Sequence, residues 1–332
     1  MTNKSALLLA SLLLSAPAQA SSRPPVIDMH LHAYRMNDVP PGAPACPGDQ
    51  RVLVPTIDPR EELDFSKLLT CTNPIVAAND DADLRAKSIA ALRRHNVRLA
   101  MTEGAVADVA AWRAAAPDVI LPGVAFGARK EKSIDELRGL HAAGQLAVLG
   151  EVYIQYRGHR PDDARYAPYF ALAEELDIPI GIHLGEGPPA AARFPGYESY
   201  RASLGSPFLL EEILRKHPKL RIYVMHYGSP LVDEMIAMMF TYPNLHVDVS
   251  CNNWSFPRAQ FHEALKRMVD AGLEKRIMFG SDQMYWPDAI GEAIKAIETA
   301  AFLDEEQKRD ILYNNAARFL RLSEDVIASH HQ

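Results

Sequence analysis

The sequence lacks several features that would place a protein in a familiar class at once. Only three cysteines occur in 332 residues, which excludes a disulfide-rich scaffold. There is no run of lysine and arginine, and the net charge is −7, so neither a nucleic acid nor an anionic membrane is expected as a partner. No Gly-x-Gly-x-x-Gly follows a predicted strand, and no Walker or Gly-x-Ser-x-Gly sequence is present. The usual nucleotide-binding motifs and the serine-hydrolase elbow are therefore absent.

The composition is that of a folded globular protein. Hydrophobic residues make up 48% of the chain and charged residues 23%, values that argue against extended disorder. After residue 20, no stretch has the roughly 18 uninterrupted apolar residues that a transmembrane helix requires.

The first 20 residues have the pattern of a secretory signal. Lys4 supplies a positive charge, an apolar run extends from Ala6 to Leu14, and Ala18-Gln19-Ala20 is a small-x-small cleavage site. We therefore expect residues 1–20 to be removed, leaving 332 − 20 = 312 residues, 21–332, as a single domain. The protein is then exported to the periplasm or the extracellular medium, with no membrane attachment once the signal is removed.

Export to an oxidising compartment changes how the cysteines are interpreted. Cys46 and Cys71 lie in one irregular stretch of sequence, and we predict that they form a disulfide. Cys251 is then left without a partner.

β-rich runs alternate with helical patterns along most of the remaining chain. The predicted strands are Val26–His30, Val97–Thr102, Val119–Phe126, Leu146–Ile154, Pro179–His183, Arg221–His226, Leu245–Ser250 and Ile277–Ser281. The predicted helices between them are Asp81–His95, Ala105–Ala115, Ser133–Ala143, Tyr166–Leu176, Pro207–Lys216, Leu231–Thr241, Ala259–Ala271 and Ala289–Thr299. Many of the strands contain consecutive Val, Ile and Leu, as is typical of parallel strands covered on both faces. Eight such repeats predict an α/β (β/α)₈ TIM barrel, with an open doubly wound sheet as the alternative.

Two segments add to a minimal barrel. Residues 33–80 form a long insertion after the first strand, rich in Pro and Gly, and we expect it to lie over the barrel mouth. At the other end of the chain, Asp304 is a candidate N-cap for a helix over Glu305–Leu312, and Ala316–Leu322 is predicted to form another. We expect this C-terminal helical extension to pack against the barrel.

Histidines and carboxylates fall at the carboxyl ends of the predicted strands, where the active sites of barrels are built. Successive strand side chains alternate between faces, so Asp28, His30 and His32 point the same way, toward the barrel axis. Other strands carry polar residues at the same end, namely Glu151, His183, His226 and Asp282. Burying so many ionisable groups together is unfavourable without compensation, and a metal ion would satisfy them jointly. The pattern therefore predicts a metal site.

Together these motifs resemble the amidohydrolase superfamily, specifically amidohydrolase family 2. The resemblance extends from about Val26 to Leu322 and is weakest across the insertion. It rests on His-x-His at residues 30 and 32, on His183 and His226, and on Gly-Ser-Asp ending at Asp282. The family implies a TIM barrel in which His30, His32, His183 and Asp282 bind a divalent metal. His226 lies beside that metal or binds a second ion.

Glu151 decides how many metals the sequence predicts. Many single-metal relatives have no carboxylate at this position, whereas some members of the superfamily use one to bridge two ions. If Glu151 points inward, His30, His32 and Asp282 hold one ion, while His183 and His226 hold another. If it points elsewhere, one metal remains. The imidazole and carboxylate ligands suit Zn, and Mn, Fe, Co or Ni are also compatible with them.

The leading hypothesis is a metal-dependent hydrolase. A metal-bound hydroxide would attack a carbonyl or phosphoryl centre in an amide, ester, lactone or related bond of a small-molecule substrate. Asp282 would act as general base and acid, and His226 would orient the hydroxide or polarise the substrate. Candidate substrate contacts follow the metal ligands in the sequence: Tyr153, Gln155, Arg157, Gln283 and Trp286.

Two alternatives come from other classes of function. The first is a metal-dependent non-oxidative decarboxylase of an unsaturated or aromatic acid, a reaction that the same branch of the superfamily includes. The second is a non-enzymatic binding protein on the same barrel, although such a protein would have no need of Asp282. Export and an inward Glu151 both favour hydrolysis. The sequence predicts neither the substrate nor the oligomeric state.

Overall fold

The computed structural model describes residues 23–51, 53, 56–64, 70–127 and 131–332. The predicted export signal, residues 1–20, lies outside these described residues. None of the helices described is long and apolar enough to span a membrane.

A sheet of eight parallel strands forms the centre of the molecule, and its order follows the sequence. The strands are β1 (Val26–Ala33), β4 (Val97–Gly104), β5 (Ile120–Phe126), β6 (Val148–Val152), β7 (Ile180–His183), β8 (Ile222–Met225), β9 (Leu245–Asp248) and β10 (Ile277–Met278). Backbone hydrogen bonds join the first strand to the last, from Met29 N to Phe279 O (2.9 Å) and from Asp282 N to His30 O (2.7 Å). The predicted TIM barrel is confirmed, and each predicted strand overlaps an observed one.

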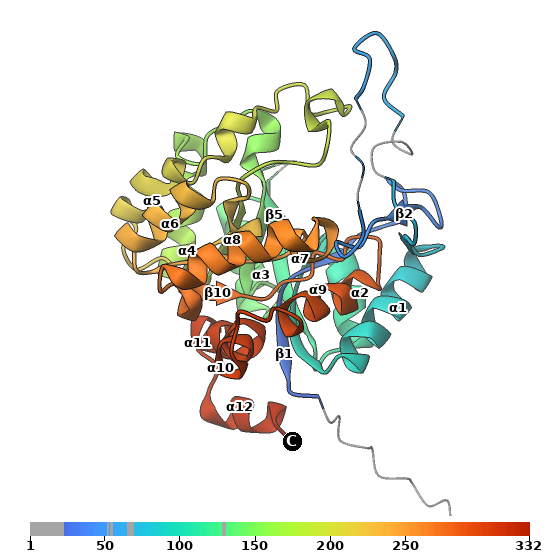
Figure 1. Ribbon diagram of the computed structural model, residues 1–332. Coiled ribbons are helices and arrows are strands. Elements are labelled where there is room, and N and C mark those ends of the chain that lie inside the picture. The colour runs from blue at the N-terminus through green and yellow to red at the C-terminus, as the bar shows by residue number, and fades with distance from the viewer. Residues whose placement is uncertain (1–22, 52, 54–55, 65–69, 128–130) are drawn as a thin grey trace, which may run out of the picture.

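Helices follow the strands and surround the sheet (Figure 1). They are α1 (Asp81–Arg94), α2 (Val106–Ala115), α3 (Ile134–Ala142), α4 (Ala167–Glu175), α5 (Glu211–Lys216), α6 (Val232–Thr241), α8 (Arg258–Asp270) and α9 (Ala289–Glu298). A short helix, α7 (Asn252–Ser255), precedes α8. Polar caps fix where several helices begin: the Asp80 side chain accepts from Asp83 N, and Ser133 forms a capping box with Glu136.

The C-terminal extension closes the end of the barrel opposite the mouth. It comprises α10 (Glu305–Arg309), a π-helical turn at Asp310–Asn314, α11 (Asn315–Leu320) and α12 (Glu324–His330). Tyr313 and Phe319 pack with the strand residues Ile27, Met29 and Tyr223 in a buried apolar cluster, and a register irregularity in β1 between Asp28 and Leu31 interrupts the strict alternation of side chains that the sequence predicted. The extension was predicted, but α12 was not. That helix is held in part by a hydrogen bond between the Tyr313 hydroxyl and His330 Nδ1 (2.8 Å).

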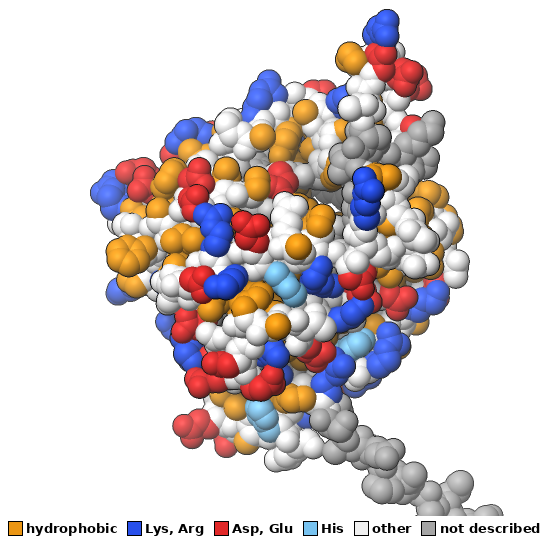
Figure 2. Space-filling view, viewed as in Figure 1, with side chains coloured by type: hydrophobic (Ala, Val, Ile, Leu, Met, Phe, Trp, Pro, Cys, Tyr) orange, Lys and Arg blue, Asp and Glu red, His pale blue; other side chains and the backbone are white. Residues whose placement is uncertain are grey.

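The insertion after β1 begins and ends at the mouth. Two short strands, β2 (Pro44–Ala45) and β3 (Ile75–Val76), pair at its base. Trp286 Nε1 donates to Ala43 O (2.9 Å), and Ala78 N donates to Tyr285 O (3.0 Å), so the base is joined to the loop after β10. Farther out, the insertion projects from the body of the molecule (Figures 1 and 2), and Arg193 donates to Glu61 O there.

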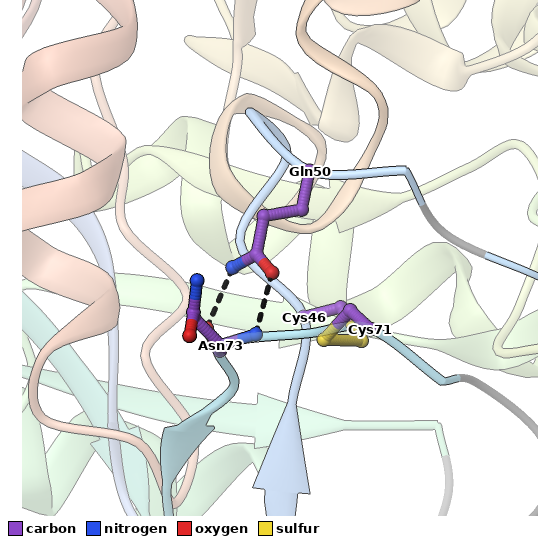
Figure 3. The surroundings of a disulfide bond; sticks show 4 residues. All are labelled: Cys46, Gln50, Cys71 and Asn73. Atoms are coloured by element: carbon purple, nitrogen blue, oxygen red, sulfur yellow. Dashed lines mark hydrogen bonds between the residues drawn. A yellow bond between two sulfur atoms is a disulfide. The ribbon is translucent and has the colours of Figure 1, made fainter.

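A disulfide joins the two sides of this insertion, as predicted (Figure 3). Cys46 and Cys71 are separated by 25 residues, and their Cα atoms lie 5.8 Å apart. Beside them, Gln50 exchanges two hydrogen bonds with the backbone of Asn73, of 2.6 and 2.7 Å. Cys251 remains a free cysteine.

Removing this disulfide is expected to destabilise the fold. A crosslink across a loop of this length lowers the entropy of the unfolded chain by an amount worth about 3 kcal/mol in free energy. The double variant Cys46→Ala/Cys71→Ala should therefore show a lower denaturant midpoint than the parent. Cys251→Ala is the matched control that leaves the crosslink intact. Equal midpoints for the double variant and the parent would contradict the prediction.

Candidate metal centre

The six predicted metal ligands meet at the mouth of the barrel. His30 and His32 lie on β1, Glu151 lies on β6, and His183 is the last residue of β7. His226 follows β8 directly, and Asp282 lies in the loop after β10. None of the six is more than 8% exposed to solvent. The structure thus brings together in one buried cluster residues that are spread over 250 positions of sequence.

Glu151 points inward and lies between two pairs of histidines. Its Oε1 is 2.6 Å from His183 Nδ1 and 3.5 Å from His226 Nε2. Its Oε2 is 3.5 Å from His30 Nε2 and 3.7 Å from His32 Nε2. Each carboxylate oxygen therefore faces a different imidazole pair, which is the arrangement expected of a ligand shared by two ions.

The outer nitrogens of the β1 histidines face acceptors, and these contacts fix the tautomers. His32 Nδ1 contacts Glu103 Oε1, a carboxylate that can only accept while ionised. His30 Nδ1 lies 2.8 Å from Ser250 Oγ, whose own hydroxyl donates to Asp248 Oδ1 (2.6 Å). Both Nδ1 atoms therefore carry the proton, and both Nε2 lone pairs face the centre of the cluster.

The other two histidines are oriented in the same way, but their outer nitrogens face backbone carbonyl oxygens. His226 Nδ1 lies 3.2 Å from Ser250 O, which turns its Nε2 lone pair inward. His183 Nε2 lies 3.2 Å from Glu186 O, so in this case Nδ1 faces the centre. Partners outside the cluster thus orient four imidazoles in the way that metal-binding histidines require.

The inward nitrogen and oxygen atoms lie close to one another. His30 Nε2 and His32 Nε2 are 3.1 Å apart, and His32 Nε2 is 2.7 Å from Asp282 Oδ1. Asp282 Oδ1 is buried and has no hydrogen-bond partner. Lone pairs at these separations repel unless a metal ion or protons lie among them. The donor set therefore fits divalent metal, and three overlapping triads have ligand atoms within 4.8 Å of one another: His30/His226/Asp282, His30/His32/Glu151 and Glu151/His183/His226.

The charges of the cluster strongly favour bound cations. Burial opposes protonation of His30 and His32, but the carboxylates around them outweigh it. Asp282 and Glu151 raise the pKa of His30 well above its usual value, and Glu103 with Asp282 raises the pKa of His32 to about 9. Burial alone would raise the pKa of Asp282, but the charges of His30 and His32 lower it to about 2. Without metal, protons supply the positive charge that the carboxylates require.

This exchange of protons for metal predicts how the stability of the metal-free protein depends on pH. The pKa of His32 is raised from 6.5 to about 9 on folding, so its contribution to stability is fully present below pH 6.5 and is lost as the pH rises through 9. Chelated protein should therefore melt at a lower temperature at pH 9 than at pH 6.5, whereas metal-loaded protein should change much less. Thermal unfolding of both forms at the two pH values tests this, and parallel changes in the two forms would contradict it.

Two ligands are held in an unfavourable backbone conformation. His226 has φ 57° and Asp282 has φ 48°, in the left-handed region that non-glycine residues rarely adopt. Hydrogen bonds hold both in place: His226 N donates to Asp248 Oδ1 (2.9 Å), and Asp282 N donates to His30 O (2.7 Å). Strain of this kind is common where a side chain must be aimed at a functional site.

The predicted substrate contacts lie in different environments. The buried amide of Gln283 accepts from His32 N (3.0 Å) and donates to His32 O (2.7 Å), so it positions a ligand strand. Trp286 contacts the base of the insertion through Ala43 O. Tyr153 is half-buried beside other tyrosines, Gln155 is buried with neither amide atom partnered, and Arg157 is exposed.

Sequence reasoning missed the residues that orient the ligands. Glu103 ends a strand in Thr-Glu-Gly, and Asp248 and Ser250 alternate along Leu245–Ser250. The period-two spacing of the last pair was a signal, because it places both side chains on the barrel-facing side with the ligands. Tyr156, whose hydroxyl lies 3.1 Å from His183 Nε2, gave no such signal.

Comparisons with known proteins agree with this architecture. The family model described as Amidohydrolase matches residues 27–322. No curated protein matches the sequence.

Solved structures share the fold at low sequence identity. A probable 2-pyrone-4,6-dicarboxylic acid hydrolase from Acinetobacter baumannii has a TM-score of 0.56 at 13% identity, covering 90% of this chain and 99% of that one. The 5-carboxyvanillate decarboxylase of Sphingomonas paucimobilis has a TM-score of 0.51 at 18% identity, covering 71% and 82%. The corresponding enzyme from Novosphingobium aromaticivorans, solved with bound manganese, has a TM-score of 0.51 at 17% identity, covering 70% and 80%.

Proposed function

Because this chain belongs to the amidohydrolase family, we propose that it is an exported metal-dependent hydrolase that cleaves an amide, ester, lactone or related bond. The solved structures that share its fold include both a probable hydrolase and decarboxylases. The choice between these reactions therefore rests on the geometry of the centre.

The position of Glu151 is the observation that supports hydrolysis. Its two oxygens face separate histidine pairs, at 2.6 Å from His183 Nδ1 and 3.5 Å from His30 Nε2. In this proposal His30, His32 and Asp282 would hold one ion, His183 and His226 would hold a second, and Glu151 would be available to both. When bound, divalent ions lower the pKa of water toward neutrality and polarise a carbonyl or phosphoryl oxygen. The imidazole and carboxylate donors suit zinc, and manganese is a second candidate.

The side chains of the centre supply proton transfer and orientation. Without metal, the pKa of Asp282 is lowered to about 2 because the positive charges of His30 and His32 outweigh burial, and divalent ions in place of those protons would likewise keep its carboxylate ionised at neutral pH. Its Oδ1 has no hydrogen-bond partner and can accept a proton from water, then pass it to the leaving group. The near-complete burial of the ligands limits bulk water at the reacting centre.

Export is supported by two independent features. The first 20 residues have the charge, apolar run and cleavage site of a secretory signal. The disulfide between Cys46 and Cys71 is of a kind that persists in oxidising compartments. A periplasmic or extracellular location follows from the proposal, and detection of the mature chain beginning at Ser21 in an exported fraction tests it.

A substrate screen tests the reaction class. Metal-loaded protein is incubated with a panel of aromatic and aliphatic esters, lactones, amides and phosphoesters, and the acid product is quantified by liquid chromatography. A parallel panel of hydroxybenzoic acids is followed for carbon dioxide. Acid release that is abolished by chelation supports the proposal. Carbon dioxide release without hydrolysis would instead assign the protein to the decarboxylases, and binding without turnover would make it a binding protein on the same barrel.

A further inference from the structure

One hydroxyl group contacts a histidine on each side of Glu151. Ser250 Oγ lies 2.8 Å from His30 Nδ1 and 3.1 Å from His226 Nδ1. The inner nitrogens of the same two rings face different oxygens of Glu151: His30 Nε2 is 3.5 Å from Oε2, and His226 Nε2 is 3.5 Å from Oε1. Ser250 is fully buried. It therefore lies behind one histidine from each of the two pairs that Glu151 separates.

The Asp248 carboxylate fixes the direction of this hydroxyl. Ser250 Oγ donates to Asp248 Oδ1 (2.6 Å), and the same oxygen accepts from Ser250 N (3.0 Å) and His226 N (2.9 Å). A serine hydroxyl has one proton and two lone pairs. Because the proton is directed at Asp248, both lone pairs are left to accept from the two imidazoles. The hydroxyl thus uses its whole hydrogen-bonding capacity, and it favours the Nδ1–H tautomer of both His30 and His226.

The local sequence places Ser250 where it can make these contacts. Residues two apart on an extended segment point to the same side, so Ser250 follows Asp248 toward the interior of the barrel. Gly280 allows this segment to approach β1 closely, because a Cβ at that position would lie 2.9 Å from His30 Cβ and 3.0 Å from Ser250 Cβ. A larger residue there would push the serine and the histidine apart.

The other partners of the ligand rings each serve a single histidine. Among the residues that the structure describes, Glu103 contacts the outer nitrogen of His32 only. Tyr156 and the carbonyl of Glu186 contact the outer nitrogen of His183 only. The Ser250 hydroxyl differs from them because it reaches both sides of the centre.

We propose that Ser250, held by Asp248, is a positioning residue for both sides of the centre, so that one hydroxyl influences the affinity of two metal ions. Neither residue contacts a metal or a substrate in this role. It rests on the two-ion arrangement given with the proposed function, and it extends that arrangement to residues outside the ligand set. Partners of metal-binding histidines change metal affinity by about 10–100-fold when they are removed, because they fix the tautomer and orientation of the ring.

Zinc binding by Ser250→Ala tests the proposal without requiring turnover. Metal-free protein is titrated with Zn²⁺ in competition with a chromophoric chelator, which gives a Kd for each equivalent bound. Both Kd values should rise by about tenfold, the lower end of the usual range, because Ser250 O (3.2 Å from His226 Nδ1) and Asp248 Oδ2 (3.5 Å from His30 Nδ1) remain as weaker acceptors.

Two further variants serve as controls for this titration. Ser88→Ala removes the hydroxyl of a buried serine on α1 that has no hydrogen-bond partner in the described part of the chain, and both Kd values should stay unchanged. Glu103→Gln should raise one Kd only, because Glu103 contacts a histidine on one side of the centre. Unchanged values in Ser250→Ala, a rise in only one of them, or a wild type that binds one ion would overturn the proposal.

Nuclear magnetic resonance separates a positioning role from a general loss of stability. In zinc-loaded protein with isotope-labelled histidine, Ser250→Ala should shift the Nδ1–H signals of both His30 and His226. The Nδ1–H signal of His32, whose acceptor is Glu103, should keep its position. Equal shifts of all three signals, or none, would contradict the shared role of Ser250.

Asp248→Asn provides a second variant if Ser250→Ala does not fold. Three donors surround Oδ1, so the amide oxygen should occupy that position and the amide nitrogen should replace Oδ2. A donor would then face His30 Nδ1, 3.5 Å away in the parent, and would disfavour the Nδ1–H tautomer. The Kd of the ion held by His30 should rise by about tenfold or more. Unchanged zinc affinity in this variant would also overturn the proposal.

The titration and the substrate screen together distinguish this role from the function on which it rests. Hydrolysis by the wild type, with equal zinc affinities in wild type and Ser250→Ala, would leave the hydrolase proposal standing and overturn the positioning role. Weaker binding of both ions by Ser250→Ala, without hydrolysis of any ester, lactone, amide or phosphoester by the wild type, would do the reverse.

Discussion

Replacing Asp282 with asparagine is expected to lower kcat/KM by about 10³-fold while the fold is retained. Loss of a general acid–base group costs roughly 10²–10⁴ in rate, and the amide of asparagine can accept no proton at neutral pH. The fold should survive because the backbone N of Asp282 donates to His30 O, and the one close ionic contact of its Oδ1, with His32 Nε2, can also be made by the amide oxygen of asparagine. Asparagine also keeps an oxygen with which to contact a metal.

The measurement combines activity on the best substrate from the screen with metal content and thermal unfolding. Asp288→Asn is the matched control, because Asp288 is an exposed carboxylate in the segment that follows the same strand. A variant that retained both its metal and its full turnover would remove Asp282 from the mechanism. Loss of metal from the variant would show that the Asp282 side chain serves mainly to bind the metal.

Removing the Glu151 side chain is expected to change the metal stoichiometry from two equivalents to one. Glu151 is the one ligand in the cluster with an oxygen near each histidine pair, so Glu151→Ala should leave too few charged ligands for the site formed by His183 and His226. The site of His30, His32 and Asp282 keeps its own carboxylate and should remain loaded.

Elemental analysis of wild type and Glu151→Ala, purified and dialysed side by side, provides the test. Glu263→Ala serves as the control for loss of an exposed carboxylate. Two equivalents falling to one would establish a shared ligand and direct screening to esters, lactones and phosphoesters. One equivalent in both proteins would make Glu151 a bystander to the metal, and decarboxylation would become the stronger hypothesis.

Much of the fold was predictable because the sequence patterns that form strands and helices are local. The β-rich runs predicted every barrel strand, many of them through consecutive Val, Ile and Leu, and the helical patterns predicted the helices that cover the sheet. The candidate ligands were predictable for a related reason. Parallel strands in a closed barrel all end at one mouth, so His30, His183 and Asp282 must meet there wherever they lie in the sequence. The disulfide followed from two cysteines in one irregular segment of the chain.

The C-terminal helix was less predictable because its stability is not local. Residues 324–330 carry little apolar pattern, and α12 has no buried residue of its own. It is held by contacts made elsewhere, such as the Tyr313 hydroxyl with His330 Nδ1 and Arg98 with the carbonyls of residues 329 and 330. A pattern search along one segment cannot detect such support.

The sequence by itself determined which residue types reach the mouth, because strand periodicity and the common end of a parallel barrel place them there. Only the tertiary structure decided what each of them contacts. The inward tautomers of His30 and His32 depend on Ser250 and Glu103, and Gln283 fixes the β1 backbone from 251 residues away. Each oxygen of Glu151 can face its own histidine pair only if β6 is offset correctly along β1 and β7. That offset must be accurate to about 1 Å. Hydrogen bonds and metal coordination vary steeply over that distance, whereas hydrophobic periodicity does not respond to it.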